Sequence, residues 1–352
     1  MRLDGDKVII VFRVDASTQI GTGHMMRCLA LASRMKKKYS ADIIFLSRDL
    51  PGNINDRVEA NGYRLLVLPR RTPNEKLKGY AAWLTVPQSQ DAAESIEVLG
   101  NIGQIDRLVV DSYAIDETWE KCLRPWVGEI FVVDDLANRR HDCDILLDHG
   151  FLPGKEESYR KLVPEGCQLM LGVKYALIRD EFILARASLP PMKKNIRNIL
   201  IFYGGADVTN ETEKAIDALI NLNLSGVDVE VIVGKSNPHK ASVKQKCANY
   251  DFVHFHEQVS NMAWYMSNAD ILLCAGGTTL LEAWHLGLPT IVTAVAENQR
   301  IGCEYCAKMD LMDYLGFYDS VEVPNIIQAV QGMSYSRRCA IKEKCELLLN
   351  DD

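Results

Sequence analysis

The chain has 352 residues, of which 47% are hydrophobic and 25% charged, with a formal net charge of -7. This composition is typical of a globular enzyme, and the length exceeds what one hydrophobic core usually organises, so we expect two domains. The acidic balance argues against binding to nucleic acid, because neutralising phosphates requires a dense surface of Lys and Arg. No run approaches the roughly 20 apolar residues of a membrane helix, so we expect no stable membrane association.

The apolar run at residues 8–12 is closely flanked by charges and no small-residue cleavage site follows it. It therefore predicts a strand and not a signal peptide. Ten cysteines lie at irregular spacings, many in apolar segments, which is typical of reduced core thiols. Cys303 and Cys306 form a lone Cys-x-x-Cys pair, which does not indicate a zinc or redox site. We expect a cytoplasmic protein.

Short β-rich runs alternate with helical runs along the first half of the chain. Several of these runs are apolar almost throughout, as expected for parallel strands buried on both faces. The predicted strands are 7–13, 42–46, 64–68, 107–111, 130–134 and 144–148, with helices between them that include 24–38 and 116–123. This alternation indicates a parallel α/β sheet covered by helices.

Paired prolines and a basic run interrupt the alternation at residues 183–197, and we place an interdomain linker at 186–197. A second series of strands is predicted at 198–203, 227–233, 252–255, 271–274 and 290–293. The sequence therefore predicts two doubly wound, Rossmann-like α/β domains, 1–185 and 198–335, with a C-terminal helix at 336–352. Two such domains facing each other enclose a cleft, and ligands bind beyond the carboxyl ends of the strands.

The loop after the first predicted strand contains Gly21, Thr22 and Gly23 directly before His24. The two glycines let the backbone turn tightly and approach a ligand. A helical pattern starts just after them, so His24 is expected in the first turn, where the helix dipole favours a neutral imidazole. A neutral imidazole is what a general base requires. A surface His after an ordinary strand–helix turn fits the same pattern.

In the second domain, two glycine-containing turns follow predicted strands. Their residues are Gly204 and Gly205 after 198–203, and Gly276, Gly277, Thr278 and Thr279 after 271–274. The second turn opens a helix, whose free backbone N–H groups form a phosphate site. Glu282, one helical turn onward, is placed to accept both hydroxyls of a ribose. A structural interpretation stays open, in which Thr279 and Glu282 form a capping box.

Two further candidates are polar residues near predicted strands. Asn298 lies at the start of the helix after 290–293, where it either bonds a sugar or serves as a helix cap. Asp142 and Asp144 form an Asp-x-Asp pair of the kind that ligates divalent metals in other sugar-nucleotide enzymes. Their place before an apolar strand favours a solvated turn. We expect no metal and no cofactor.

Several segments between residues 7 and 317 can be compared in order with known families. They are FRVDASTQIGTGHMMRCLALA, VVDSYAID, VDDLANRRHDCDILLDHG, LGVKYALIRDEF, YGGADVTNET, NMAWYMSNADILLCAGGTTLLEAWHLGLP and ENQ. As an ordered set they resemble the UDP-2,4-diacetamido-2,4,6-trideoxy-β-L-altropyranose hydrolases of pseudaminic acid biosynthesis. That family is similar to the peptidoglycan N-acetylglucosaminyltransferase. The resemblance therefore implies the GT-B fold, and transfer of the sugar to water without a metal.

The resemblance also implies roles for single residues. His24 would deprotonate the attacking water, so that the anomeric configuration inverts, and Tyr113 and Asn298 would lie in the sugar pocket. Asp15, in the loop with the two glycines, would orient His24 or the sugar. Glu282 would hold the ribose, and the glycine turn before it the diphosphate. The free sugar would enter a nonulosonic acid destined for flagellin or capsule.

The chain departs from the family pattern at three places. Ser112 replaces a His, His149-Gly150 replaces a Gln-Asn or similar pair, and Leu280-Leu281 replaces Thr-Trp before the ribose position. Ser112 and His149 are expected near the substituents of the sugar. The departures therefore leave open which diacetamido sugar is accepted.

Two other functions stay open. The first is a glycosyltransferase that passes the sugar to a lipid or polysaccharide, for which residues 69–71 are a modest candidate for a basic membrane face. The second is a non-catalytic UDP-sugar-binding protein, which the change at Ser112 favours and the presence of His24 disfavours. The expected partners are a UDP-sugar and water, and we expect a monomer.

Overall fold

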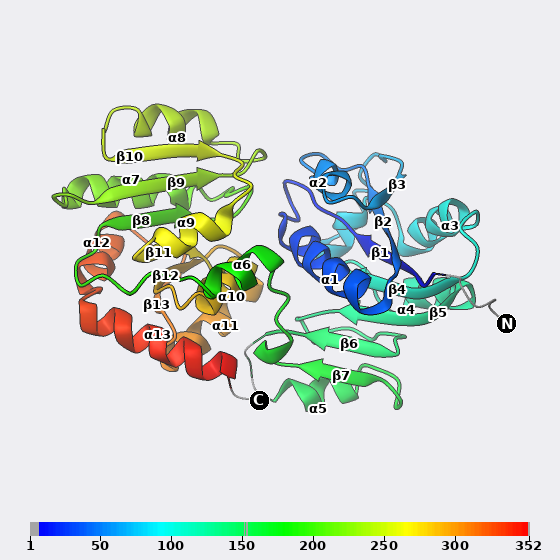
Figure 1. The fold of residues 1–352 in the computed structure, drawn as a ribbon. Helices are drawn as coiled ribbons and strands as arrows, with labels where there is room; N and C mark the ends of the chain where they lie inside the picture. The colour runs from blue at the N-terminus through cyan, green and yellow to red at the C-terminus, as the bar shows by residue number, and fades with distance from the viewer. Residues whose placement is uncertain (1–6, 151, 153, 351–352) are drawn as a thin grey trace. The chain divides into compact units, whose positions relative to one another are not determined.

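The computed structural model of the protein describes residues 7–150, 152 and 154–350, and it divides into two compact units, 1–177 and 178–352. Each unit is a parallel β-sheet with helices packed against it (Figure 1). The predicted fold class, two doubly wound Rossmann-like α/β domains in tandem, is confirmed.

The first unit contains a seven-stranded sheet of order β3-β2-β1-β4-β5-β6-β7. Its strands are β1 (Ile9–Val14), β2 (Asp42–Arg48), β3 (Arg64–Leu68), β4 (Ile105–Asp111), β5 (Val127–Val133), β6 (Ile145–Asp148) and β7 (Gln168–Leu171). Its helices are α1 (Gly23–Tyr39), α2 (Asn55–Ala60), η1 (Gly79–Leu84), α3 (Gln88–Leu99), α4 (Glu117–Leu123), η2 (Arg124–Trp126), α5 (Lys155–Arg160) and η3 (Val173–Tyr175). Strand order reverses between β1 and β4, which is where ligands of such sheets bind.

The core of the first unit lies on both faces of this sheet. Along β1, Ile10 and Phe12 belong to one buried cluster, which includes Met25 of α1, whereas Val11 belongs to the other. The alternation follows from the two-residue period of a strand. Burial on both faces explains why β1 reads as a continuous apolar run.

The second unit contains a six-stranded sheet of order β10-β9-β8-β11-β12-β13. Its strands are β8 (Asn198–Phe202), β9 (Asp228–Val233), β10 (Val253–Glu257), β11 (Ile271–Ala275), β12 (Thr290–Ala294) and β13 (Asp313–Phe317). Its helices are α6 (Asp180–Arg186), α7 (Glu211–Leu222), α8 (Lys240–Cys247), α9 (Met262–Asn268), α10 (Thr278–His285), α11 (Glu297–Lys308), α12 (Val323–Gly332) and α13 (Tyr335–Asn350). Here strand order reverses between β8 and β11.

The two units join between residues 177 and 178, N-terminal to the linker predicted at 186–197. The reason is that α6 packs against α9 and α10 of the second unit (Figure 1). The segment with the paired prolines therefore belongs to the second unit and does not separate the two.

The C-terminal helix α13 is also part of the second unit, where it packs against α10 and buries Ile341 and Cys345. Arg338 Nη2 donates to the carbonyl oxygens of Lys193 at 3.1 Å and Lys194 at 2.8 Å. These bonds fasten the proline-containing segment to the helix. Within residues 7–150, 152 and 154–350, no helix has the length and apolarity needed to cross a bilayer.

Candidate active site

The loop that carries His24 leaves β1 at the point where strand order reverses. Gly21 adopts a φ of +81°, a conformation that disfavours a side chain, and its N–H donates to the carbonyl oxygen of Ser17 at 2.8 Å. Helix α1 begins at Gly23, so His24 lies in its first turn, as expected. The turn thus delivers His24 to the carboxyl edge of the sheet.

The side chain of His24 forms a hydrogen bond with Asp111, the last residue of β4. The Nδ1 atom of His24 lies 2.6 Å from Oδ1 of Asp111, and their side chains are 9% and 0% exposed. Val14 at the end of β1 is in register with Asp111, and the loop that follows Val14 leads to His24 at the same edge of the sheet. An ionised carboxylate only accepts, so Nδ1 carries the proton and Nε2 is left as the basic nitrogen.

Arg27, one turn after His24, fixes the same carboxylate. Its Nε donates to Asp111 Oδ2 and its Nη2 to Asp111 Oδ1, both at 2.7 Å. Burial alone would raise the pKa of Asp111, but Arg27 and then His24 outweigh it and hold that pKa well below its usual range. Asp111 is therefore a permanent anion beneath the imidazole.

The remaining nitrogen of Arg27, Nη1, contacts two residues that follow β5 and β6. Its Nη1 donates to Asp135 Oδ2 at 2.9 Å and lies 3.3 Å from Nε2 of His149. Burial would raise the pKa of Asp135, but Arg27 and a hydrogen bond from Tyr113 bring it to about 2. Burial and the charge of Arg27 lower the pKa of His149 to about 4. His149 is thus neutral near pH 7.

Four rings gather at this edge of the first unit. The ring of Tyr113 packs edge-on to His24 with centroids 4.6 Å apart, and stacks on Trp83 of η1 at 5.4 Å. Tyr80, also in η1, lies 5.0 Å from Tyr113 and 4.9 Å from Trp83. Tyr80 and Trp83 are only half-buried, so this cluster of aromatic rings is partly exposed to solvent beside the imidazole.

Two residues expected near the sugar have other partners. Asp15 Oδ1 accepts from Arg13 Nη1 and from the backbone N–H of Arg48, both at 2.7 Å, so the structure assigns the orientation of His24 to Asp111 and not to Asp15. The other carboxylate oxygen of Asp15 is buried and has no hydrogen-bond partner among the described residues. Ser112 Oγ accepts from the N–H of Ala114 at 3.2 Å and so holds its own turn.

In the second unit, the turn at 276–279 opens α10 as predicted. The helix begins at Thr278 with Gly277 as its N-cap, and no side chain caps it. A Cβ added to Gly276 would lie 2.3 Å from Sγ of Cys303, so this turn has no room for a side chain. Its first backbone N–H groups suit an anion.

The other glycine turn differs because its helix is already capped. Gly204, after β8, has a φ of +90°, and a Cβ on Gly234 would lie 2.2 Å from the carbonyl oxygen of Gly205. The carboxylate of Asp207 accepts the N–H groups of Glu211 and Thr212 at the start of α7, each at 3.0 Å. Of the two turns, the one before α10 therefore offers the better phosphate site.

The ribose candidate Glu282 does not form the capping box with Thr279. Both of its oxygens instead accept from Arg179, with Nε at 2.6 Å and Nη2 at 2.9 Å. Asn298 is exposed as the second residue of α11, whose N-cap is Ala296. The alternative interpretation of Asn298 as a helix cap is therefore wrong.

The acidic and sulfur motifs have structural partners. Asp142 pairs with Arg124 Nε at 3.0 Å and Asp144 with Arg124 Nη1 at 2.5 Å. Cys303 and Cys306 are buried free thiols in α11. Across the part of the chain that the structure describes, no group of three or more His, Cys, Asp or Glu side chains is arranged to hold a metal ion.

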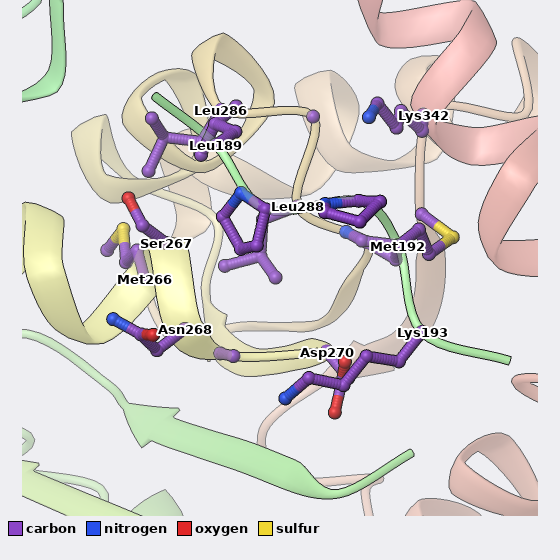
Figure 2. Close-up of a pocket in the computed structure, with 15 residues that line it drawn as sticks. Leu189, Met192, Lys193, Met266, Ser267, Asn268, Asp270, Leu286, Leu288 and Lys342 are labelled. Carbon is purple, nitrogen blue, oxygen red and sulfur yellow. The ribbon is translucent and has the colours of Figure 1, made fainter. Parts of the chain in front are cut away.

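Figure 2 shows a hollow in the second unit that lies away from these turns. It is lined by residues 189–193, 266–270, 286–289 and Lys342. Because β11 begins at Ile271 and β12 at Thr290, the hollow is at the amino ends of these strands. Ligands of doubly wound sheets bind at the opposite ends, so we assign no substrate to it.

Five residues of the site were not predicted from the sequence, namely Arg27, Tyr80, Trp83, Asp111 and Asp135. Their positions were readable in part. Asp111 ends a predicted strand that pairs with β1, and Arg27 follows His24 by three residues, which places both on one face of a helix. Nothing local to Asp135 indicated that it would meet Arg27.

Comparison with known proteins agrees with this architecture. A sequence profile of the family "Glycosyl transferases group 1" matches residues 197–306. An uncharacterized protein of Methanocaldococcus jannaschii is 25% identical over 304 residues, which are 84% of this chain and 57% of that protein. The chain therefore spans little more than half the length of this relative.

Two further similarities cover nearly the whole of both proteins. The UDP-2,4-diacetamido-2,4,6-trideoxy-β-L-altropyranose hydrolase of Campylobacter jejuni is 25% identical over 302 residues, 85% of this chain and 96% of the relative. The structure of Phytolacca americana UGT2 complexed with UDP-2-fluoro-glucose and pterostilbene superposes with a TM-score of 0.69 at 12% identity, covering 97% and 94% of the two chains. The chain therefore has the GT-B fold, with two parallel-sheet Rossmann-like domains, and its residues 197–306 are similar to the group 1 glycosyl transferases.

Proposed function

We propose that the chain hydrolyses a UDP-linked 2,4-diacetamido-2,4,6-trideoxy sugar to UDP and the free sugar. The observation that carries the proposal is the pairing of His24 with Asp111 at the carboxyl edge of the first sheet, where ligands of doubly wound sheets bind. Support also comes from the Campylobacter jejuni hydrolase, which is similar over 96% of its length.

In the proposed reaction, Nε2 of His24 removes a proton from a water molecule as the water oxygen attacks the anomeric carbon. The bond between that carbon and the diphosphate oxygen breaks, and its electron pair leaves with UDP. Asp111 orients the imidazole and stabilises the imidazolium that forms. Attack opposite the leaving group inverts the anomeric configuration.

The second unit would stabilise the departing diphosphate. The uncapped N-terminus of α10 presents backbone N–H groups at Thr278 and Thr279 to developing negative charge. Gly277 leaves room for the phosphates, Gly276, Gly204 and Gly205 border them, and Glu282 binds the ribose. Expulsion of UDP would then need no metal ion.

The proposed sugar subsite lies beside His24. Tyr113 and Trp83 would pack against the methyl groups of a deoxy, acetylated sugar, since aromatic faces favour apolar contacts. The polar atoms of Asp15, His149 and Asn298 would bind its amide or hydroxyl groups.

The rival is a glycosyltransferase, which the match of residues 197–306 to the group 1 family supports equally. The two are distinguished by incubating the protein with UDP-2,4-diacetamido-2,4,6-trideoxy-β-L-altropyranose and EDTA, with and without lipid and polysaccharide acceptors. We expect UDP release at the same rate with or without acceptor. Release that requires an acceptor would replace the hydrolase proposal with the glycosyltransferase.

A further inference from the structure

The ion pair between Arg179 and Glu282 is bidentate and links the start of α6 to α10. Arg179 Nε donates to Glu282 Oε1 at 2.6 Å, and Nη2 donates to Oε2 at 2.9 Å. The two side chains are 21% and 11% exposed. The pair is thus largely, but not completely, withdrawn from solvent.

The third guanidinium nitrogen extends this connection to α9. Arg179 Nη1 donates to Glu181 Oε1 at 2.6 Å, and Glu181 Oε2 accepts the N–H of Ala263 at 3.2 Å. Helix α9 follows β10 and helix α10 follows β11. Arg179 therefore joins two helices that both begin at the carboxyl edge of the second sheet, where a nucleotide would bind.

The bidentate geometry leaves Glu282 able to accept two more hydrogen bonds. A carboxylate has about four lone-pair positions, and the two N–H groups of Arg179 use one on each oxygen. Burial raises the pKa of Glu282 above its usual value, and the charge and hydrogen bonds of Arg179 offset only part of that rise. A carboxylate fixed in this way is an acceptor with a defined plane, which suits the two adjacent hydroxyls of a ribose.

We propose that Arg179 is a positioning residue for ribonucleotide recognition. By holding both oxygens of Glu282, it presents their free lone pairs to the 2′- and 3′-hydroxyls of a uridine diphosphate. This inference rests on the proposed function, in which Glu282 binds the ribose of UDP. It adds that the preference of the site for ribose over deoxyribose depends on Arg179.

The same helix provides a matched control. Arg186, in the last turn of α6, is half-buried and also reaches α10, where its Nη1 lies 3.4 Å from Nδ1 of His285. Its contact on α10 is an imidazole and not a carboxylate. Arg186→Gln thus removes a guanidinium from the same interface without altering Glu282.

The test is isothermal titration calorimetry of the full chain with UDP and with 2′-deoxy-UDP. The proteins are the wild type, Arg179→Gln, Arg179→Lys and Arg186→Gln, each checked by circular dichroism and thermal unfolding. Loss of a fixed hydrogen-bond acceptor weakens binding by about tenfold. We expect Arg179→Gln to bind UDP about tenfold more weakly than the wild type does. This variant should bind UDP no more tightly than it binds 2′-deoxy-UDP. Arg186→Gln should keep the affinity and the preference of the wild type.

Arg179→Lys retains the charge but cannot form the bidentate contact, and it carries the test if Arg179→Gln does not fold. We expect it to lose most of the preference for ribose. A wild type that prefers UDP, with Arg179 variants that keep the same preference, would overturn this inference and leave the proposed function standing. A wild type that binds neither nucleotide would overturn the proposed function and this inference with it.

Discussion

The Nδ1 atom of His24 and the Oδ1 atom of Asp111 lie 2.6 Å apart, at the carboxyl ends of two neighbouring strands. Arg27 donates two hydrogen bonds of 2.7 Å to the same carboxylate, one to each of its oxygens. The carboxylate cannot rotate without losing these bonds, so the imidazole has one orientation and one tautomer. In the proposed function, this arrangement lets a histidine at a helix start act as a general base through Nε2.

Asp111→Asn should therefore abolish most of the activity. An amide in place of the carboxylate no longer requires the proton on Nδ1 and does not stabilise an imidazolium, so kcat should fall about hundredfold or more. The proposed UDP site is in the second unit, so UDP affinity should stay that of the wild type. The control is Asp142→Asn, whose carboxylate pairs with Arg124 instead. Wild-type kcat in Asp111→Asn would show that the pairing has no role in turnover.

The stability of the first unit should depend on pH through His149. In the folded protein its pKa is about 4, against 6.5 for a free imidazole. Between these values the unfolded chain binds more protons than the folded chain, so stability rises with pH across this window and is lost as the pH falls through it. His149→Gln should flatten the change in thermal midpoint between pH 4.5 and 7. Parallel pH profiles for the two proteins would rule this explanation out.

Trp83→Ala should weaken binding of the sugar and spare binding of the nucleotide. Removing the indole takes away the ring that stacks on Tyr113 at 5.4 Å, and with it apolar contact to the acetamido and methyl groups. We expect KM for the UDP-sugar to rise about tenfold while UDP alone binds as before. Trp126→Ala, at an exposed indole in the same unit, is the control. Equal effects of both substitutions on KM would show that Trp83 is not part of the sugar site.

The turn before α10 should tolerate no side chain at Gly276. An added methyl group would lie 2.3 Å from Sγ of Cys303, so Gly276→Ala should destabilise the protein by about 1–3 kcal/mol and reduce UDP affinity. Adding Cys303→Ala should restore part of the stability. Gly302→Ala is the matched control, because nothing lies within 4 Å of its added Cβ. An unchanged thermal unfolding midpoint in Gly276→Ala would show that the added methyl group does not clash with Cys303.

Much of the fold was predictable because buried parallel strands are apolar throughout. Every strand expected from the pattern is present, from β1 to β6 and from β8 to β12. The edge strands β7 and β13 were missed because their residues are mostly half-buried and their apolar runs are no longer than three residues. The domain boundary was misplaced because prolines mark a break in secondary structure, whereas the packing of α6 decides which unit it belongs to.

Only those residues of the candidate site that belong to a local sequence motif could be predicted. His24 and the turn at Gly276 stand out because a glycine turn opens a helix after a strand. Asp111 and Asp135 become neighbours of Arg27 only through strand order and side-chain direction, which a linear pattern does not contain. The partner of Glu282 was missed for the same reason, since Arg179 precedes it by 103 positions.

Proton NMR during turnover would show whether His24 activates water for inverting hydrolysis, as we propose. Wild type and His24→Ala would be followed with UDP-2,4-diacetamido-2,4,6-trideoxy-β-L-altropyranose in the presence of EDTA. We expect the wild type alone to release UDP and a sugar whose first-formed anomer has inverted configuration, while His24→Ala still binds UDP. Release of sugar by His24→Ala at the wild-type rate, or a first-formed anomer of retained configuration, would refute this role of His24.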